Sequence, residues 1–374
     1  MFNKFEHLYI HWPFCKSKCY YCDFLSFANN EEFQKKYHDT LISQLKNFKN
    51  IVSLKTIFIG GGTPSIYPLD LLKELFEQLK KSFDFSHIKE ITIEANPRDI
   101  TEEKLNTWRE VGINRLSIGV QVLDDDILAK VGRNQSVKDV FNAIKIAPKY
   151  FDNISVDLIL GLPEISKKSW QKTLQEVVSW PINHVSCYIL TQYKGTRLDS
   201  MIKKREIYLQ KDDRIISLYQ ETVDFLREHE FIQYETSNFS KKGFESIHNI
   251  AYWDRKTYLG LGLGASSFDG QNRFINEKKI LNFFNLTQDP LKGSKREVLS
   301  GQQEFIEFLM LSLRQAKGGG LHRMLYFLGS DEKIRFLDKL ENLKKLGLIR
   351  INGGRVYLTL RGMLLENEVI LRLL

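Results

Sequence analysis

The sequence predicts an α/β fold, built as a partial (β/α)6 barrel and followed by a smaller helical domain. Short, β-rich apolar runs recur through the first half of the chain, and longer segments with helical spacing of apolar residues separate them. Strands that alternate with helices form βα units with a parallel sheet. A flat, doubly wound sheet is the structural alternative, because it shows the same alternation.

Six segments are predicted strands, and the longer segments that separate the early strands are predicted helices. The strands are LYIHW near Leu8, TIFIG near Thr56, EITIEA near Glu90, NRLSIGV near Asn114, ISVDLIL near Ile154 and HVSCYIL near His184. The helices include EEFQKKYHDTLISQLKNF, LDLLKELFEQLKKSF and EEKLNTWREVG. Ligands bind at the carboxyl ends of the strands in both candidate folds, so the residues that end or follow each strand are the candidates for a site.

The alternation stops near residue 200, which divides the chain into a barrel (1–205), a connecting segment (206–295) and a C-terminal domain (296–374). The connecting segment holds one predicted helix, DDRIISLYQETVDFLREHE, and aromatic, glycine-rich loops. The C-terminal domain closes with a helix ending at Gly347, two short strands around a Gly353–Gly354 turn and a last helix. This order resembles a winged-helix domain.

Composition argues against several classes of function. The net charge is +8, but the basic residues lie in short scattered runs that are typical of a solvated surface. The last helix, MLLENEVILRLL, is mostly apolar, so no nucleic-acid partner is expected. No apolar run approaches the roughly 18 residues of a membrane span, and the N-terminus lacks the pattern of a signal peptide. We expect a cytoplasmic protein.

Three of the four cysteines are clustered as C-x3-C-x2-C in CKSKCYYC, at Cys15, Cys19 and Cys22. Three thiolates can bind three irons of a cubane cluster and leave the fourth iron open for a small chelating molecule. A structural zinc site is the alternative and needs a fourth ligand, such as His11 or His184. The fourth cysteine, Cys187, lies in an apolar strand and is predicted to be core.

The cysteine spacing, with an aromatic residue directly before the last cysteine, resembles the signature of the radical-SAM family. That resemblance implies a radical-SAM barrel with a [4Fe–4S] cluster on Cys15, Cys19 and Cys22, and S-adenosylmethionine (SAM) on the open iron. Cleavage of SAM to a radical would make the protein an enzyme, but no catalytic residue is predicted.

The resemblance also implies a SAM site on the strand ends. The GGGTP loop after the second strand resembles the loop that holds the methionyl amino group, and Glu94, in EANP, matches the family's SAM-binding glutamate. Asp157 lies among apolar residues, where an unpaired carboxylate is costly, and Arg133 is a candidate partner for it. The predicted SAM-binding residues are Tyr9, Gly61, Gly62, Thr63, Glu94, Gln121, Arg133 and Asp157.

Longer motifs, among them YIHWPFC, IFIGGGTPS, DLILGLP and YETSNFS, resemble the coproporphyrinogen oxidase-like group. That group contains the oxygen-independent oxidases and the heme chaperones. Three features favour the chaperones. Phe24 stands where the oxidases have a further cysteine, Tyr9 already lies in the first strand with no long extension before it, and residues 248–253 match the chaperone motif HNxxYW.

The resemblance to the chaperones therefore implies a protein that binds heme and delivers it to a recipient hemoprotein, such as a respiratory or membrane-associated one. Coproporphyrinogen III oxidation is the alternative activity. His248 is the predicted axial heme ligand, and a hydrogen-bonded structural histidine beside Tyr252 and Trp253 is the alternative. Ser266 departs from the family pattern, which has a histidine there.

Overall fold

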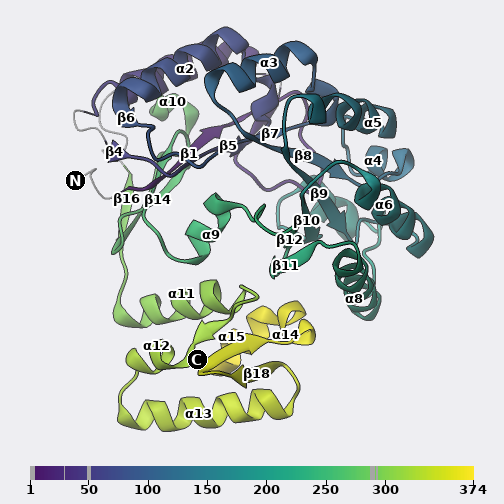
Figure 1. The fold of residues 1–374 in the computed structure, drawn as a ribbon, viewed down its shortest axis with the longest axis vertical. Helices are drawn as coiled ribbons and strands as arrows, with labels where there is room; N and C mark the ends of the chain where they lie inside the picture. The colour runs from purple at the N-terminus through teal and green to yellow at the C-terminus, as the bar shows by residue number, and fades with distance from the viewer. Residues whose placement is uncertain (1–4, 29, 49–51, 287–290, 292–293) are drawn as a thin grey trace.

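The computed structural model describes residues 5–28, 30–48, 52–286, 291 and 294–374. Its centre is a twelve-stranded sheet with the strand order β11-β12-β10-β9-β8-β7-β5-β1-β13-β14-β15-β16 (Figure 1). The predicted strands form its middle and are all parallel to one another. They are β1 (His7–Trp12), β5 (Thr56–Gly61), β7 (Glu90–Ala95), β8 (Arg115–Gln121), β9 (Asn153–Leu160) and β10 (His184–Ile189). The partial (β/α)6 barrel is confirmed.

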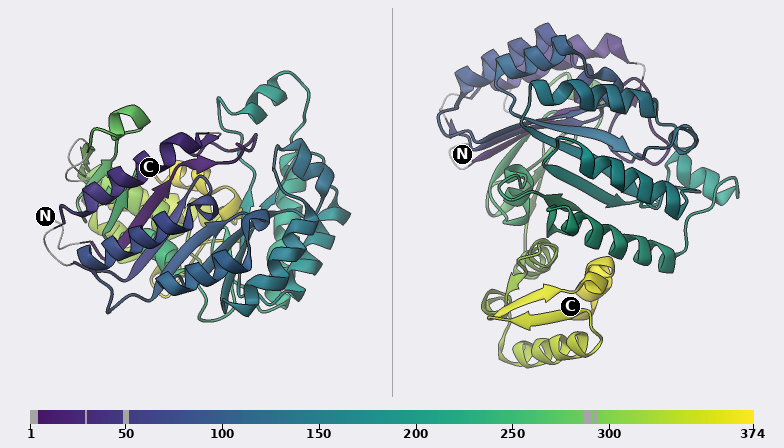
Figure 2. Two further views of the ribbon diagram at one scale, coloured as in Figure 1. Left: turned by 90° about the horizontal axis from the view of Figure 1, so that it is seen from above. Right: turned by 45° about the vertical axis from the view of Figure 1, so that its right-hand side comes forward.

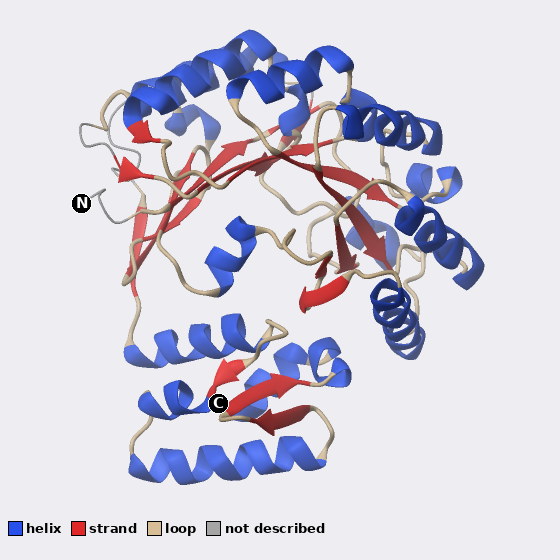
Figure 3. Ribbon diagram, viewed as in Figure 1, coloured by secondary structure: helices blue, strands red, loops and turns tan. Residues whose placement is uncertain are grey.

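Helices cover the convex face of this sheet, as Figures 1 and 3 show. They are α1 (Gln34–Leu45), α2 (Leu69–Ser82), α3 (Glu102–Val111), α4 (Asp125–Lys130), α5 (Val137–Ile146) and α6 (Lys167–Ser179). The apolar residues of β8, such as Leu116 and Ile118, belong to the core under these helices. Because side chains alternate along a strand, Arg115 and Ser117 face the opposite, concave side. The concave face is therefore polar.

The segment 206–295 does more than connect, because its strands extend the same sheet at both edges. β11 (Ile232–Glu235) and β12 (Asn238–Ser240) continue from β10, with β12 antiparallel to β10. β13 (Tyr258–Leu261) pairs parallel with β1, and β14 (Ser266–Phe268), β15 (Asn272–Ile275) and β16 (Lys295–Val298) follow antiparallel. α7 (Arg197–Lys203) precedes this segment, and the helices within it are α8 (Asp212–Glu228), α9 (Ile247–Trp253) and α10 (Ile280–Phe283). Of these, α9 lies on the concave side (Figure 1).

The C-terminal residues form a separate body below the sheet (Figures 1 and 2). It contains α11 (Gly301–Leu313), α12 (Leu321–Tyr326), α13 (Ser330–Lys345), α14 (Leu360–Leu364) and α15 (Glu366–Leu373) around a small sheet of β17 (Gly319–Gly320), β19 (Arg355–Leu358) and β18 (Ile349–Asn352). Its apolar core is distinct from that of the large sheet. Gly353 and Gly354 both have positive φ, as a tight hairpin turn requires. The single last helix that we predicted is divided into α14 and α15.

Two further pairs of short strands flank the large sheet, β2 (Phe14–Cys15) with β3 (Phe27–Ala28) and β4 (Val52–Ser53) with β6 (Phe83–Asp84). Among the residues described, no helix has the length and apolar character needed to cross a bilayer.

Candidate cofactor site

The clustered cysteines lie on one loop at the carboxyl end of β1. Cys15 ends β2, and its parallel pairing with β3 brings the chain back at Ala28. Midway, the Tyr20 N–H donates to the Val131 carbonyl at 2.9 Å, and the Tyr20 carbonyl accepts from the Leu198 N–H at 2.8 Å. The loop is therefore fixed to the C-terminal end of α4 and to the first turn of α7.

All three clustered thiols are free and half-buried. Burial raises the pKa of the Cys15 thiol, against the opposing effect of hydrogen bonds with Thr63 and Ser26. Burial also raises the pKa of Cys22 to about 11. A bound cation is needed to convert such thiols to thiolates at neutral pH.

The cysteine loop suits a cluster in which each thiolate binds a different iron. A single ion would need at least three ligands that converge on one point, and no such group of His, Cys, Asp or Glu side chains is found in the described ranges. Arg133 supplies positive charge here, with its Nη1 at 3.5 Å from the Cys19 sulfur. Cys187 is buried in β10, away from this loop, as predicted for a core residue.

The glycine loop after β5 packs directly onto the cysteine loop. The Gly62 N–H donates to the Trp12 carbonyl at 2.7 Å, and the Thr63 N–H donates to the Phe14 carbonyl at 2.9 Å. A Cβ atom on Gly62 would lie 2.7 Å from the Phe14 carbonyl oxygen. Only glycine permits this approach, so the loop geometry and the position of Cys15 depend on each other.

Two buried carboxyl groups stand beside these loops. Glu94 accepts a hydrogen bond from the Gly61 N–H at 3.1 Å, and Asp157 accepts from the Ser117 hydroxyl at 3.0 Å. Burial, with the nearby Asp157, raises the pKa of Glu94 to about 8, and burial also raises the pKa of Asp157. An ammonium group placed here would lower both pKa values and find two acceptors.

The predicted charge pair between Arg133 and Asp157 is not formed. Arg133 donates instead to the Gly119 carbonyl at 3.1 Å, to Gln135 at 2.9 Å and to Asn96. Asp157 meets its hydrogen-bonding need through serine hydroxyls, which could not be foreseen from one sequence.

The remaining predicted residues line the same concave face. Gln121 has φ of +68° at a β-bulge that ends β8, which turns its side chain at the site edge. The Tyr9 hydroxyl forms a 2.9 Å hydrogen bond with His11 Nδ1, and His11 Nε2 reaches the Leu25 carbonyl at 2.9 Å. Sequence reasoning missed this link between β1 and the cysteine loop, although His11 stands in the YIHWPFC motif.

His248 and the cysteine loop lie at opposite ends of β5. His248 bonds to Thr56, the first residue of that strand, whereas the glycine loop that packs on the cysteine loop follows the last residue. The side chain is fully buried on α9. Hydrogen bonds join its Nδ1 to Thr56 Oγ1 at 2.6 Å and its Nε2 to the Tyr252 hydroxyl at 2.8 Å. Burial holds the pKa of His248 well below its usual value. Both ring nitrogens of His248 are therefore engaged in hydrogen bonds within the protein, and its role as heme ligand stays a prediction.

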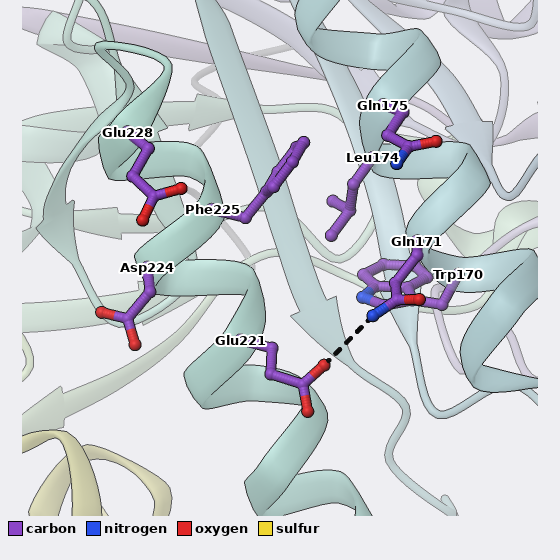
Figure 4. Close-up of a pocket in the computed structure, with 8 residues that line it drawn as sticks. All are labelled: Trp170, Gln171, Leu174, Gln175, Glu221, Asp224, Phe225 and Glu228. Atoms are coloured by element: carbon purple, nitrogen blue, oxygen red, sulfur yellow. Dashed lines mark hydrogen bonds between the residues drawn. The ribbon is translucent and has the colours of Figure 1, made fainter.

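Two surface cavities have similar volumes but different surroundings. One of about 430 Å³ adjoins the cysteine loop and is lined by Lys18, Cys19, Tyr20, Cys22, Asp23, Lys194, Gly195, Thr196 and Arg197. The other, about 420 Å³, lies between α6 and α8 (Figure 4). Its lining, which includes Trp170, Glu221 and Phe225, contains none of the predicted site residues. The first cavity is therefore the candidate entrance to the cysteine loop.

Comparison with known proteins agrees with this geometry. The model of the Radical SAM superfamily matches residues 9–177. The heme chaperone HemW of Bacillus subtilis is 34% identical, over 96% of this chain and 97% of that protein. The chain belongs to the HemW family. HemW of Lactococcus lactis is 31% identical over 99% of this chain.

HemW membership confirms the resemblance inferred from the motifs. A solved structure also supports the fold, namely the coproporphyrinogen III oxidase HemN of Escherichia coli, described as a radical SAM enzyme. The two chains superpose with a TM-score of 0.84 over 100% of this chain and 91% of HemN, at 22% identity. This similarity establishes a shared radical-SAM fold.

Proposed function

We propose that this chain is a cytoplasmic heme chaperone, which binds heme and passes it to a recipient hemoprotein. The recipient would be a respiratory or membrane-associated protein. The observation that carries the proposal is the similarity to proteins named heme chaperone HemW over nearly the whole chain. Phe24 supports it, because this side chain is 62% exposed and occupies the position of the oxidases' further cysteine.

The cysteine loop would hold a [4Fe–4S] cluster through Cys15, Cys19 and Cys22, and SAM would lie between this loop and the strand ends. Three features fit these groups: the free thiols, the glycine backbone packed onto their loop, and the carboxyl groups of Glu94 and Asp157, which form no ion pair among the described residues. When bound, the reduced cluster supplies the electron that can cleave SAM. The residues proposed to orient SAM are Tyr9, Gly61, Gly62, Thr63, Glu94, Gln121, Arg133 and Asp157.

The C-terminal body would be a winged-helix-like domain that docks the recipient and not nucleic acid. Its helices and small antiparallel sheet support this interpretation. The exposed side chains of Tyr326, Ile334 and Leu337 give it apolar surface for a protein partner. Within the barrel, His248 would fix α9 against the sheet.

The HemN-like fold keeps coproporphyrinogen III oxidation as a second candidate. An anaerobic assay on the reconstituted protein separates the two by offering heme and, separately, coproporphyrinogen III. We expect stoichiometric heme binding and transfer to an apo-hemoprotein, without decarboxylation. Decarboxylation with release of 5′-deoxyadenosine would overturn the chaperone proposal.

A further inference from the structure

The concave face of the sheet contains a buried cation that forms no ion pair or hydrogen bond with the described part of the chain. Arg115, the first residue of β8, is 2% exposed, and its Nε is buried without a hydrogen-bond acceptor. Among the residues described, no carboxylate forms an ion pair with its guanidinium, and no hydrogen bond is made to it. A guanidinium carries five N–H donors and is always charged, so leaving it unpaired in a protein interior is costly.

The residues paired with Arg115 across the sheet share this lack of partners. Thr92 on β7 and Asn153 on β9 are its direct neighbours in register. Thr92 Oγ1 and Asn153 Oδ1 are likewise buried without a hydrogen-bond partner. Folded proteins leave few such atoms. Arg115 Nε and the Thr92 hydroxyl can both donate to an acceptor group of a ligand, whereas Asn153 Oδ1 can only accept.

The positive charge of Arg115 opposes the rise in the pKa of Glu94 and of Asp157, but among the described residues no acidic side chain forms an ion pair with it. Glu90 accepts hydrogen bonds from the backbone N–H groups of Ile247 and His248, at 2.8 and 3.1 Å, and so caps α9. Glu94 and Asp157 are engaged with the glycine loop and with Ser117. The direct ion pair that Arg115 lacks among the described residues is therefore open to a carboxylate of a ligand.

We propose that Arg115 binds the carboxylate of a porphyrin side chain, flanked by Thr92 and Asn153. The proposal rests on the chain's proposed heme-binding function. A guanidinium fork matches a carboxylate through two parallel hydrogen bonds, and heme carries propionate groups on flexible arms. The carboxylate of SAM is a less suitable ligand for Arg115. The predicted SAM site includes Arg133, which donates to the Gly119 carbonyl, and Gly119 lies four residues, or about 13 Å, further along β8 than Arg115.

The proposal is tested by titrating heme and heme dimethyl ester, which lacks free carboxylates, into wild-type protein and Arg115→Gln. We expect the wild type to bind heme about tenfold to a hundredfold more tightly than the ester, as for a hydrogen-bonded charged group. Arg115→Gln should bind both ligands equally, near the wild-type affinity for the ester. Equal binding by the wild type would overturn this proposal alone, whereas no heme binding at all would overturn the proposed function with it.

Stability of the ligand-free protein separates ligand binding from a structural role. Arg115→Met replaces the unpaired cation with an apolar chain, so its melting temperature should equal or exceed that of the wild type. A marked decrease would show that Arg115 serves the fold and would overturn the proposal. The affinity of Arg115→Gln for SAM should equal that of the wild type. If the variant binds SAM more weakly but still prefers heme to the ester, Arg115 belongs to the SAM site and the proposal is overturned. The exposed arginine variant Arg109→Gln is the matched control and should keep all wild-type values.

Discussion

Glu94 and His248 are buried ionisable side chains that the fold favours in their neutral forms. Burial raises the pKa of Glu94 to about 8 from the ordinary 4.5. Burial lowers the pKa of His248 well below 6.5. Each difference between the folded and unfolded states makes stability depend on pH, but in opposite directions.

For Glu94, the stabilisation of the folded state is complete below pH 4.5 and is lost as the pH rises through about 8. We therefore expect the melting temperature of the cofactor-free wild type to fall between pH 5 and 8 more steeply than that of Glu94→Gln. Thermal unfolding at a series of pH values measures this difference. Glu103→Gln, at an exposed site on α3, serves as the control, and parallel curves for wild type and Glu94→Gln would contradict the expectation.

His248→Ala should destabilise the protein by about 2–3 kcal/mol at pH 7, because it opens a cavity, leaves the Tyr252 hydroxyl without its partner and removes one of the two partners of the Thr56 hydroxyl. The contribution of His248 is present above pH 6.5 and is lost as the pH falls toward its lowered pKa. The cost of the substitution should therefore shrink in acid, as denaturant titrations at two pH values would show. Loss of heme binding with unchanged stability would instead identify His248 as the heme ligand.

At the scale of elements, the contact between the β5 loop and the cysteine loop couples two ligand-holding segments. The backbone of Gly62 and Thr63 is hydrogen-bonded to residues 12 and 14, next to Cys15. A Cβ atom at Gly62 would lie too close to the Phe14 carbonyl oxygen. A substitution of Gly62 should therefore displace the cysteine loop while the core beneath stays packed.

Gly62→Ala should therefore weaken SAM binding to the reconstituted protein about tenfold, given strain of roughly 1–3 kcal/mol at such a contact. Its thermal stability should change little. Gly301→Ala is the matched control, because a Cβ at Gly301 meets no atom within 4 Å. Calorimetric titration of SAM, with iron content measured in parallel, would detect the difference. Equal affinities in the two variants would refute the coupling of the loops.

The parallel strands were predictable from the sequence because each one is a short, β-rich apolar run, and longer segments with helical spacing of apolar residues separate these runs. The strands of residues 206–295 were not. β13 is only Tyr258–Leu261, and it joins the sheet beside β1, whose residues lie some 250 positions earlier. Such a short run, rich in glycine, carries no local signal, and its place is set by tertiary packing.

At the scale of the whole molecule, ion pairs join the C-terminal body to the large sheet. Arg314, the C-cap residue of α11, forms an ion pair with the fully buried Glu235 at 2.8 Å. Glu307, on the same helix, accepts from Arg255 at 2.7 Å and from Arg273 at 2.5 Å. Leu360 and Leu364 of α14 also pack against the core of the large sheet, so apolar and polar contacts together couple the two bodies.

Arg314→Ala should cost about 3–5 kcal/mol, because it leaves a buried carboxylate without its partner. The double variant with Glu235→Gln should recover much of that loss. Unfolding measured by denaturant, together with limited proteolysis, would show whether the C-terminal body separates first. Arg372→Ala breaks an exposed pair with Glu368 and should cost well under 1 kcal/mol. Similar costs for both arginines would contradict this account.

The ligand site was predictable as far as it consists of short contiguous motifs. Spacing predicts the three thiols, and position at or after the end of a strand predicts the glycine loop and Glu94. Arg115 and the serine partners of Asp157 do not, because their roles depend on which side chains remain unpaired once the strands are assembled. The role of His248 is also not determined by the sequence, because the HNxxYW motif is compatible with a heme ligand and with a buried histidine that holds α9 by hydrogen bonds.

The parallel pairing of β1 with β13 has a consequence for how the chain is made. His7 leaves the ribosome early, yet its partner Tyr258 is synthesised some 250 residues later. Until then one side of β1 has unpaired backbone groups, a state that favours association with other chains. We infer that the half-barrel completes its folding late in translation, and that chains truncated before residue 258 would aggregate.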